Sequence, residues 1–576
     1  MADQPERRAW HLAEASHGPD AEVAQLLEDG AHDSLARGDA LTATTSLIRA
    51  ANLSTDPAEG RRRLAEAAFI GTDITGEFVR SDRLGNGPDL RPANGPGSLY
   101  EAVAAAYLSI AQGGDFDAAH RTIMRAINSG DHGWRADNAE LIEAMNGWLV
   151  ICWHAGREDC WLQFFDALDR LTPAAPDLLR LQALACGDTA RTGAEAREPL
   201  RAIVGQLSDS RDPSRVARIS MSTMHLDLIA ECRDALWFVI EDGRRGGAIR
   251  PYVRSLAVAC IDDYYRGRWD EAQELADEGV AVCHADGYED SMWYFAYIQA
   301  LLSAVHGAGE DTDQWAKELK LTTIRQGAVG AYRFVSHPES LAAIASADWD
   351  SAYRHASELS PAGEFRPFVP QALWVAYDLV EAAMRSGRVG SARAHVRAME
   401  GIGLPSLSPR MALLTAGAIA LASADDDFIG AYNAALGLPE ADSWPFDQAR
   451  IQLAFGERLR RDPHSRGARD VLHAALDTFE TIGAVPWADR TREELRATRE
   501  RTLRLPPVAF FGTLTTQELA IVELAAKGLS NKDIASRRFL SPRTVGGHLY
   551  RAFPKLGVTS RAALSDALRA PDLNRN

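Results

Sequence analysis

The chain has few cysteines and no long apolar run. It holds six cysteines in 576 residues, none in a Cys-x-x-Cys pair, at positions 152, 160, 186, 232, 260 and 283. This pattern predicts reduced, mostly buried thiols in a cytoplasmic protein, without a disulfide framework or a metal site. The longest apolar stretch, Met411 to Ala424, is too short to cross a bilayer. The first residues lack the apolar core of a secretion signal, so no membrane partner is expected.

Sequence motifs of the common enzyme classes are also missing. The chain has no Gly-x-x-x-x-Gly-Lys-Ser/Thr phosphate loop, no His-Glu-x-x-His metal motif and no Gly-x-Ser-x-Gly nucleophile turn. We therefore predict that the protein is not an enzyme and uses no cofactor. Large rings such as Trp293-Tyr294 could line a small-molecule pocket, but their helical spacing favours packing between helices.

Positive charge is scarce in the body of the chain and gathers at its carboxyl end. The net charge is −18, yet the residues from Phe511 onward carry ten Lys and Arg against five Asp and Glu, which leaves −23 on the rest. A basic end on an acidic body favours a phosphate-binding module, because neutralised phosphates release counterions and supply most of the affinity. The alternative is an ordinary solvated surface.

Helix-start signals cluster in this basic end. Thr515 and Glu518 form a capping-box pattern, in which the hydroxyl and the carboxylate each satisfy a backbone donor. A first helix should therefore begin near Thr516. It should end at Lys527-Gly528, where a cation meets the negative end of the helix and glycine can adopt the left-handed conformation.

Two further helices should follow at once. Ser530 predicts a second helix, from Asn531 to about Phe539, and Ser541-Pro542 repeats the start signal for a third. Only Leu540 and its immediate neighbours remain for the turn between them. A connection this short makes the two helices cross steeply, as in a helix-turn-helix.

The third helix carries two different faces. An apolar stripe should face the other helices and consists of Val545, Leu549, Ala552 and Leu556. The opposite face is polar, basic and poor in side chains, with Arg543, Gly547, Tyr550 and Arg551. A fourth helix, capped by Thr559 or Ser560, should run to about Ala570.

Four strings in this segment carry a family resemblance. They are Gly528-Leu-Ser-Asn-Lys-Asp-Ile-Ala, Leu540-Ser-Pro-Arg-Thr-Val, His548-Leu and Lys555-Leu-Gly-Val-Thr-Ser-Arg561. Together they resemble the LuxR-type helix-turn-helix over residues 511 to 570. In that family the third helix enters the major groove, the second braces it against the phosphates, and the fourth can pair two monomers. The resemblance implies double-stranded promoter DNA as a partner and a homodimer.

The resemblance also assigns DNA contacts by position. The base-facing sites fall on Gly546, Gly547 and Tyr550. The sites of phosphate contact fall on Lys532, Ser541, Arg543, Thr544 and Arg551. His548 and Arg561 complete the predicted DNA-binding set.

The sequence departs from the family pattern at three places. Gln517 and Leu519 replace two arginines that commonly flank the glutamate of the first helix. The adjacent Gly546 and Gly547 each cost about 1 kcal/mol relative to alanine in a helix. They either let the backbone approach the groove floor closely or indicate weak, unspecific binding. Pro554 should kink or end the third helix near its position.

A recurring phrase organises the residues upstream, which read as helices almost everywhere. Gly or Ala is followed by a polar residue, a bulky residue, two more residues and then Ala, and the phrase recurs at small multiples of about 39 residues. The instances are Gly38/Ala43, Gly114/Ala119, Gly267/Ala272, Ala347/Ala352, Gly387/Ala392 and a weaker Asp426/Ala431. They predict an all-α fold, with a tetratricopeptide-like α-solenoid of helix pairs followed by the small four-helix LuxR-type domain. The alternative is a globular bundle in which glycines and aromatic rings simply pack at helix turns.

Two segments rich in glycine or proline predict the domain boundaries. Residues 81–98 should form an exposed loop after an amino-terminal helical piece, residues 1–80. Residues 503–512 should form a stiff linker between the repeat array, residues 99–502, and the DNA-binding domain, residues 513–576. The array and the DNA-binding domain should then move as separate bodies.

The opening phrase of the chain completes the resemblance. Arg8-Ala-Trp-His-Leu-Ala-Glu-Ala and the helical body resemble the second half of large ATP-binding LuxR-type regulators of actinobacteria, without their nucleotide-hydrolysing domain. This implies a transcriptional regulator, expected to be an activator. Its array would sense a small-molecule or protein inducer, and its terminal domain would bind a promoter and recruit RNA polymerase. The competing hypothesis is a protein-interaction scaffold whose terminal module mainly dimerises.

Overall fold

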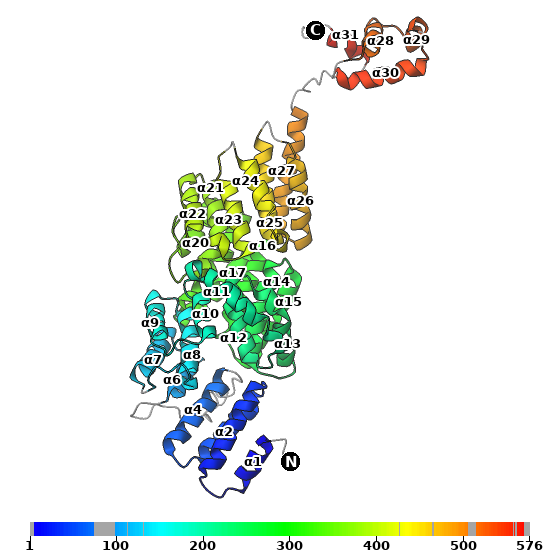
Figure 1. Cartoon of the computed structure of the whole chain (residues 1–576). Helices are drawn as coiled ribbons and strands as arrows, with labels where there is room; N and C mark the ends of the chain where they lie inside the picture. The colour runs from blue at the N-terminus through cyan, green and yellow to red at the C-terminus, as the bar shows by residue number, and fades with distance from the viewer. Residues whose placement is uncertain are drawn as a thin grey trace. The chain divides into compact units, whose positions relative to one another are not determined.

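The molecule is helical throughout the part of the chain that can be described. The computed structural model describes residues 5–73, 98–111, 113–130, 132–424, 427–462, 466–504, 514–538, 540–556, 558 and 561–568. These ranges contain α-helices and short 3-10 turns and no β-strand. The predicted all-α fold is confirmed (Figure 1).

The chain divides into two compact units, residues Met1–Arg492 and Glu493–Asn576. The division falls within one continuous helix, α27 (Val485–Arg504). Most of the predicted 81–98 loop and of the predicted 503–512 linker lies outside the described residues. The domain boundaries expected from the sequence therefore remain predictions.

The helices of the first unit follow one another along the chain. The first of them are α1 (Pro5–Ala15), α2 (Ala21–Ala36), α3 (Ala40–Leu53), α4 (Pro57–Asp73), α6 (Leu99–Ala111), α7 (Phe116–Ser129), α8 (Ala139–Ala155), α9 (Glu158–Asp169), α10 (Asp177–Cys186), α11 (Thr189–Val204), α12 (Pro213–Thr223), α13 (Arg233–Arg244) and α14 (Ile249–Tyr265). The next are α15 (Trp269–Asp286), α16 (Met292–His306), α17 (Gly309–Arg325), α18 (Val329–Tyr332), α19 (Ser336–Ala345), α20 (Trp349–Leu359), α21 (Ala376–Arg385), α22 (Val389–Gly401), α23 (Pro409–Ala422), α24 (Phe428–Leu436), α25 (Pro445–Arg461) and α26 (Ala468–Ile482), before α27. Among the described helices, none combines the length and the apolar character needed to span a bilayer.

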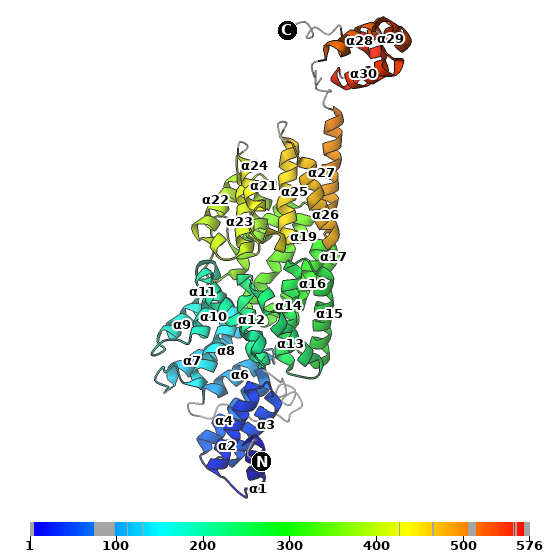
Figure 2. The ribbon, with the colours of Figure 1, turned by 45° about the vertical axis from the view of Figure 1, so that its right-hand side comes forward.

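Helices that follow one another in the chain pack as pairs. α2 packs on α3, α14 on α15, α16 on α17, α19 on α20 and α25 on α26. Both ribbon views show such pairs succeeding one another through the first unit (Figure 1, Figure 2). The predicted array of helix pairs is confirmed for the described residues.

The recurring phrase marks helix starts. Its five stronger instances immediately precede α3, α7, α15, α20 and α22. At the first, Gly38 has φ +87°, Asp39 accepts a hydrogen bond from Thr42 N at 3.0 Å, and Ala43 is fully buried. The alanines of the other four instances are buried as well. The weaker instance differs, because Ala431 of α24 is only half-buried.

The same turn occurs at places that the sequence phrase did not reveal. Positive-φ glycines at 156, 307 and 483 precede α9, α17 and α27, and the fifth residue after each is buried. Those buried residues are Trp161, Thr312 and Ala488. Two of the three turns lack the alanine, and the third has Ala484 where the phrase has a polar residue. A search for one residue pattern therefore missed them.

The array coils so that distant turns meet. Side-chain to main-chain or side-chain bonds recur at sequence separations of 174 to 181 residues. They join Arg191 to Phe365, Arg333 to Gly156, Arg266 to Ser443, His306 to Gly483 and Ser408 to Asp227. The chain thus returns to the same place after roughly four to five repeat units, as expected for a tightly wound solenoid.

Apolar and aromatic side chains fill the spaces between these helices. All six cysteines are free and buried, as expected. Trp293 is 1% exposed, and its ring lies 5.3 Å from that of Phe334. Large rings at helical spacing therefore serve as core here, which agrees with the packing interpretation of the sequence.

Candidate nucleic-acid interface

The second unit contains three helices around a short turn. They are α28 (Thr516–Ala526), α29 (Asn531–Arg538) and α30 (Pro542–Lys555), followed by the 3-10 turn η8 (Arg561–Ala563) and the short α31 (Leu564–Ala567). The predicted bounds of the first two helices and the start of the third are confirmed. α30 continues to Lys555 and so passes Pro554. The predicted caps of the fourth helix, Thr559 and Ser560, lie outside the described residues.

Side chains cap the three helices as the sequence predicts. Thr515 Oγ1 accepts from Glu518 N at 3.2 Å, and Glu518 Oε2 accepts from Thr515 N at 3.0 Å, which completes a capping box. Ser530 Oγ accepts from Asp533 N at 3.3 Å at the start of α29. Ser541 Oγ accepts from the backbone N–H three residues later at 3.0 Å. Local sequence thus sets each of these helix starts.

One apolar core joins the helices of this unit. Its buried members are Ile521, Val522, Ala525, Ile534, Ala535, Val545, Leu549, Ala552, Leu556 and Leu564. They include the whole apolar stripe that was predicted for α30, which is therefore confirmed. Because that stripe points inward, the opposite face of α30 points outward.

A buried carboxylate links α28 to the last turn of α30. Lys555 Nζ donates to Glu518 Oε2 at 2.7 Å, and Glu518 is only 4% exposed. This hydrogen bond and the one from the Thr515 backbone lower the pKa of Glu518 to about 2. The two residues are 37 positions apart, so no local pattern in the sequence indicates their contact.

The outward face of α30 is exposed and lightly covered. Tyr550 is 81% exposed, which leaves its ring almost entirely in solvent. Five other residues of the predicted DNA-binding set are exposed: Lys532, Ser541, Arg543, Thr544 and Gly547. Gly546 and His548 are half-buried. Arg551 belongs to α30, but its side chain lies outside the described residues.

The two glycines leave bare backbone on this face. A Cβ atom at Gly547 would meet nothing within 4 Å, and one at Gly546 would lie 3.7 Å from Asn531 Nδ2, an ordinary van der Waals distance. Internal packing therefore does not require glycine at either position. Two glycines inside a helix lower its stability relative to alanine.

Arg561 is half-buried and bonded within the second unit. Its guanidinium donates to Asn531 Oδ1 at 2.5 Å and also to the carbonyl oxygen of Leu529. These bonds fasten η8 to the turn between α28 and α29. They use two of the five N–H donors of the guanidinium, so DNA binding by Arg561 remains a prediction. Asn531, which the sequence indicated only as a helix start, thus holds this turn together.

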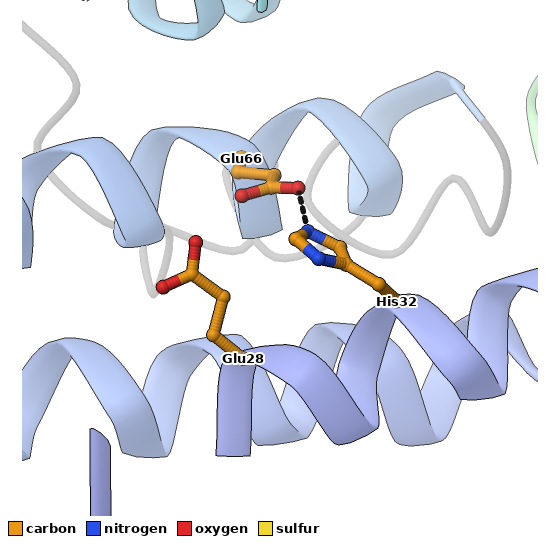
Figure 3. Close-up of side chains that lie close together, drawn as sticks. All are labelled: Glu28, His32 and Glu66. Atoms are coloured by element: carbon orange, nitrogen blue, oxygen red, sulfur yellow. Dashed lines mark hydrogen bonds and ion pairs between the residues drawn. The ribbon is translucent and has the colours of Figure 1, made fainter. Parts of the chain in front are cut away.

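Two clusters in the first unit place histidine and carboxylate side chains at distances that a metal ion could use. In the first, His32 Nε2 lies 2.7 Å from Glu66 Oε1, with Glu28 beside them (Figure 3). Glu28, however, accepts from Arg62 Nη2 at 2.5 Å and from Arg63 Nε at 2.7 Å. The positive charge of these arginines already neutralises the carboxylates, so the cluster is an ion-pair network.

The second cluster is balanced in the same way. Lys320 Nζ donates to Glu339 Oε1 at 2.5 Å, and Arg354 Nη2 donates to His355 Nε2 at 2.9 Å. The proton of His355 is then on Nδ1, which lies 3.0 Å from Glu339 Oε2. A metal ion would have to displace that proton, so this arrangement does not favour one.

Sequence comparison relates the second unit to known bacterial proteins. Residues 512–568 match the luxR family of bacterial regulatory proteins. The spore germination protein GerE of Bacillus subtilis is 39% identical over 61 residues, which are 10% of this chain and 82% of GerE. The Bordetella pertussis virulence factors transcription regulator BvgA is 42% identical over 60 residues, 10% of this chain and 29% of BvgA.

A third relative matches a longer stretch of the chain. A Mycobacterium tuberculosis H37Rv protein named as an HTH-type transcriptional regulator is 45% identical over 93 residues. The match covers 16% of this chain and only 9% of that relative. A solved circular tandem repeat protein aligns with 84% of this chain and 91% of its own, at 15% identity and a TM-score of 0.13, which is too low to indicate a shared fold.

Proposed function

Because the chain belongs to the luxR family of bacterial regulatory proteins, we propose that it is a DNA-binding transcriptional regulator. Its second unit inserts α30 into the major groove of promoter DNA. α29 braces this helix against the phosphates. Two copies of the unit bind half-sites about one helical turn (~34 Å) apart.

The outward face of α30 is the observation that carries this proposal. It combines an exposed cation, Arg543, with bare backbone at Gly547 and an exposed ring at Tyr550. Arginine supplies charge-assisted hydrogen bonds to phosphate, and bare backbone allows a groove floor to approach closely. The tyrosine ring can contact base edges. The helix core needs none of these three residues.

The first unit is proposed to act as the sensor. It is an acidic array of helix pairs, and no catalytic motif occurs in the sequence. Repeat arrays of this kind present extended surfaces to ligands and proteins. A small-molecule or protein inducer would act here, and the bound regulator would activate transcription by recruiting RNA polymerase.

Electrophoretic mobility shift on the chain's own promoter region tests the DNA-binding role. Arg543→Ala and Tyr550→Ala should each weaken binding, by about tenfold for the arginine, because one charge-assisted contact is lost. Matched controls in the first unit are Arg245→Ala, whose side chain is 76% exposed, and Tyr332→Ala, which is 36% exposed. Unchanged binding by the first pair of variants would refute these contacts.

The second candidate function is an interaction scaffold in which the terminal unit mainly dimerises. Its support is the size of the helical array relative to the small second unit. Salt dependence separates the two candidates. A DNA reader loses affinity steeply as salt rises, since each neutralised phosphate releases a counterion, whereas a protein clamp does not follow that slope.

A further inference from the structure

A large hollow lies near the carboxyl end of the first unit. Its volume is about 900 Å³, and its walls come from α21, α22, α24, α25 and the end of α23. Ligand-binding pockets commonly measure ~300–1,000 Å³. The size alone admits a small molecule, so the chemistry of the walls decides what kind.

Positive charge dominates the polar part of these walls. Four arginines line the hollow against two acidic residues: Arg385, Arg393, Arg458 and Arg461 against Glu457 and Asp462. The body of the chain is strongly acidic, with −23 on the residues before Phe511. A local excess of arginine in such a body favours an anion.

Some of these arginines also have a structural role. Arg393 Nε donates to the carbonyl oxygen of Ala422 at 3.2 Å, and Arg458 Nη2 donates to that of Ser423 at 2.9 Å. These bonds satisfy the last carbonyl groups of α23, a usual task for cations at a helix end. The bond of Arg393 occupies one N–H of its guanidinium, and Arg393 is otherwise exposed at the wall of the hollow.

Buried polar atoms in the walls lack partners among the described residues. The hydroxyl of Tyr432 is fully buried and makes no hydrogen bond to a described residue, and neither does Nε of Arg385. A buried polar group that makes no hydrogen bond is unfavourable. Both residues line the hollow, so a ligand with acceptor oxygens could satisfy them.

The remaining wall is apolar. It consists of Met384, Val389, Leu421, Phe428 and Ala454. An inorganic ion would leave this part of the wall unused. An organic anion with an apolar group would bury it and gain the free energy of apolar burial.

The hollow shares one glutamate with the helix that leads to the second unit. Glu457, which is 2% exposed, accepts from Arg385 in the wall and from Arg490 of α27, whose Nε and Nη2 lie 2.9 and 2.7 Å from Glu457 Oε1. Trp487 of the same helix packs against Phe446, with ring centroids 4.9 Å apart. A change in the ion pair between Arg385 and Glu457 would therefore also alter the ion pair between Glu457 and Arg490 of α27.

We propose that this hollow binds a small organic anion, a carboxylate or phosphate ester with an apolar group, which competes with Glu457 for Arg385 and so alters the hold of the array on α27. This inference rests on the proposed function, because it identifies the inducer site of the sensor unit. Guanidinium groups bind carboxylate and phosphate in bidentate fashion, which fits the donor set of the wall.

Binding is tested first on the full-length chain without DNA. Isothermal titration should show binding of 4-phenylbutyrate, and much weaker binding of the neutral 4-phenylbutan-1-ol and of inorganic phosphate. Equal binding of the alcohol would overturn the role of the arginines, and equal binding of inorganic phosphate would overturn the role of the apolar wall. Failure of 4-phenylbutyrate to bind would overturn the site.

Substitutions test whether the probe binds in this hollow. Arg393→Gln should weaken binding of 4-phenylbutyrate by about tenfold, since one charge-assisted hydrogen bond is lost. Arg393→Lys keeps the charge and should retain most of the affinity. Arg397→Gln removes an exposed arginine one turn further along α22, outside the hollow, and should change nothing. Equal affinity of Arg393→Gln and Arg397→Gln would overturn the assignment.

Coupling to α27 is tested by hydrogen exchange of residues 485–492. Saturating 4-phenylbutyrate should raise their exchange rate in the natural chain, and unchanged exchange would overturn the competition for Arg385. DNA affinity is measured separately on the unliganded chain. Loss of DNA binding together with intact probe binding would refute the proposed function and leave the site standing. Intact DNA binding without probe binding would overturn the proposed site in the hollow and leave the proposed function standing.

Discussion

At Gly547 of the second unit, the residue that favours folding differs from the residue that the proposed DNA contact favours. It lies inside α30, it is exposed, and an added Cβ atom would meet nothing within 4 Å. A helix interior normally favours alanine over glycine. Glycine at this position is thus unfavourable for folding, and the proposed close approach of DNA would explain it.

Gly547→Ala should therefore change stability and DNA affinity in opposite directions. The free energy of unfolding of the second unit should rise by about 0.5–1 kcal/mol, because alanine has the higher helix propensity. DNA affinity should fall, because a methyl group would separate α30 from the groove. Denaturant unfolding and mobility shift measure the two quantities. Gly390→Ala in α22, also without atoms within 4 Å, is the control and should leave DNA affinity unchanged.

Glu518 makes the free energy of unfolding of the second unit depend on pH. Its pKa is lowered from 4.5 to about 2, chiefly by the hydrogen bond from Lys555. A carboxyl group with a lowered pKa stabilises the folded state fully above its unfolded value, and this contribution is lost as pH falls toward the folded value.

We expect native-state hydrogen exchange of α28 and α30 to report this loss. Protection should be constant above pH 5 and should decrease between pH 4.5 and pH 2, after correction for the intrinsic exchange rate. Glu518→Gln cannot ionise, so its protection should be lower at neutral pH and should lack this decrease. The same acid response in both chains would show that the Glu518–Lys555 pair is not its source.

At the scale of elements, Arg561 holds η8 against the turn that precedes α29. Removing the guanidinium leaves the Leu529 carbonyl and the Asn531 side chain without these donors. Arg561→Ala should lower the free energy of unfolding of the second unit by about 1.5–3 kcal/mol, the usual range for a hydrogen bond to a charged group.

The salt dependence of DNA binding by Arg561→Ala tests whether this member of the predicted DNA-binding set contacts a phosphate. Loss of one such contact reduces the slope of log K against log[salt] by about 1. The same reduction is expected for Arg543→Ala, which is exposed and should not change stability. A slope equal to that of the natural chain would limit Arg561 to holding the turn.

Helix turns in the array depend on close approach between distant elements. Gly156, the C-cap of α8, has φ +62°, and an added Cβ would lie 2.4 Å from the backbone nitrogen of Gly330. Gly387 has a similar φ of +78°, but nothing lies within 4 Å of its Cβ position. Alanine substitutions at the two glycines therefore distinguish the cost of left-handed backbone strain from the cost of a steric clash.

Gly156→Ala should be much more destabilising than Gly387→Ala. Both variants incur roughly 1–2 kcal/mol of left-handed strain. Gly156→Ala should cost about 1–3 kcal/mol more, because the methyl group must force two segments apart. Thermal or denaturant unfolding of the first unit measures the difference. Equal losses would mean that the contact with Gly330 adapts without cost.

For the whole molecule, charge separates an acidic first unit from a basic carboxyl end. Three cations of the predicted set, Lys532, Arg543 and Arg551, should each neutralise one phosphate. Two copies then neutralise six, which predicts a slope of log K against log[salt] of roughly −5. Mobility shift over a range of salt concentrations measures it, and a slope near zero would favour the scaffold.

The sequence by itself determined the local features of this protein. Helix starts at Thr515, Ser530 and Ser541 and the inward stripe of α30 depend on residues within four positions of one another, so caps and periodicity predict them. The exposed face of α30 follows from the same periodicity. Repeat turns such as Gly38 were predicted for the same reason.

Tertiary structure alone decided the features that join distant residues. Glu518 and Lys555 are 37 positions apart, and the turns of the array meet across 174 to 181 residues. The hollow beside Glu457 needs five helices to be placed against one another. Such contacts depend on small crossing angles added over many helix pairs, and these angles follow from side-chain packing rather than from any local pattern.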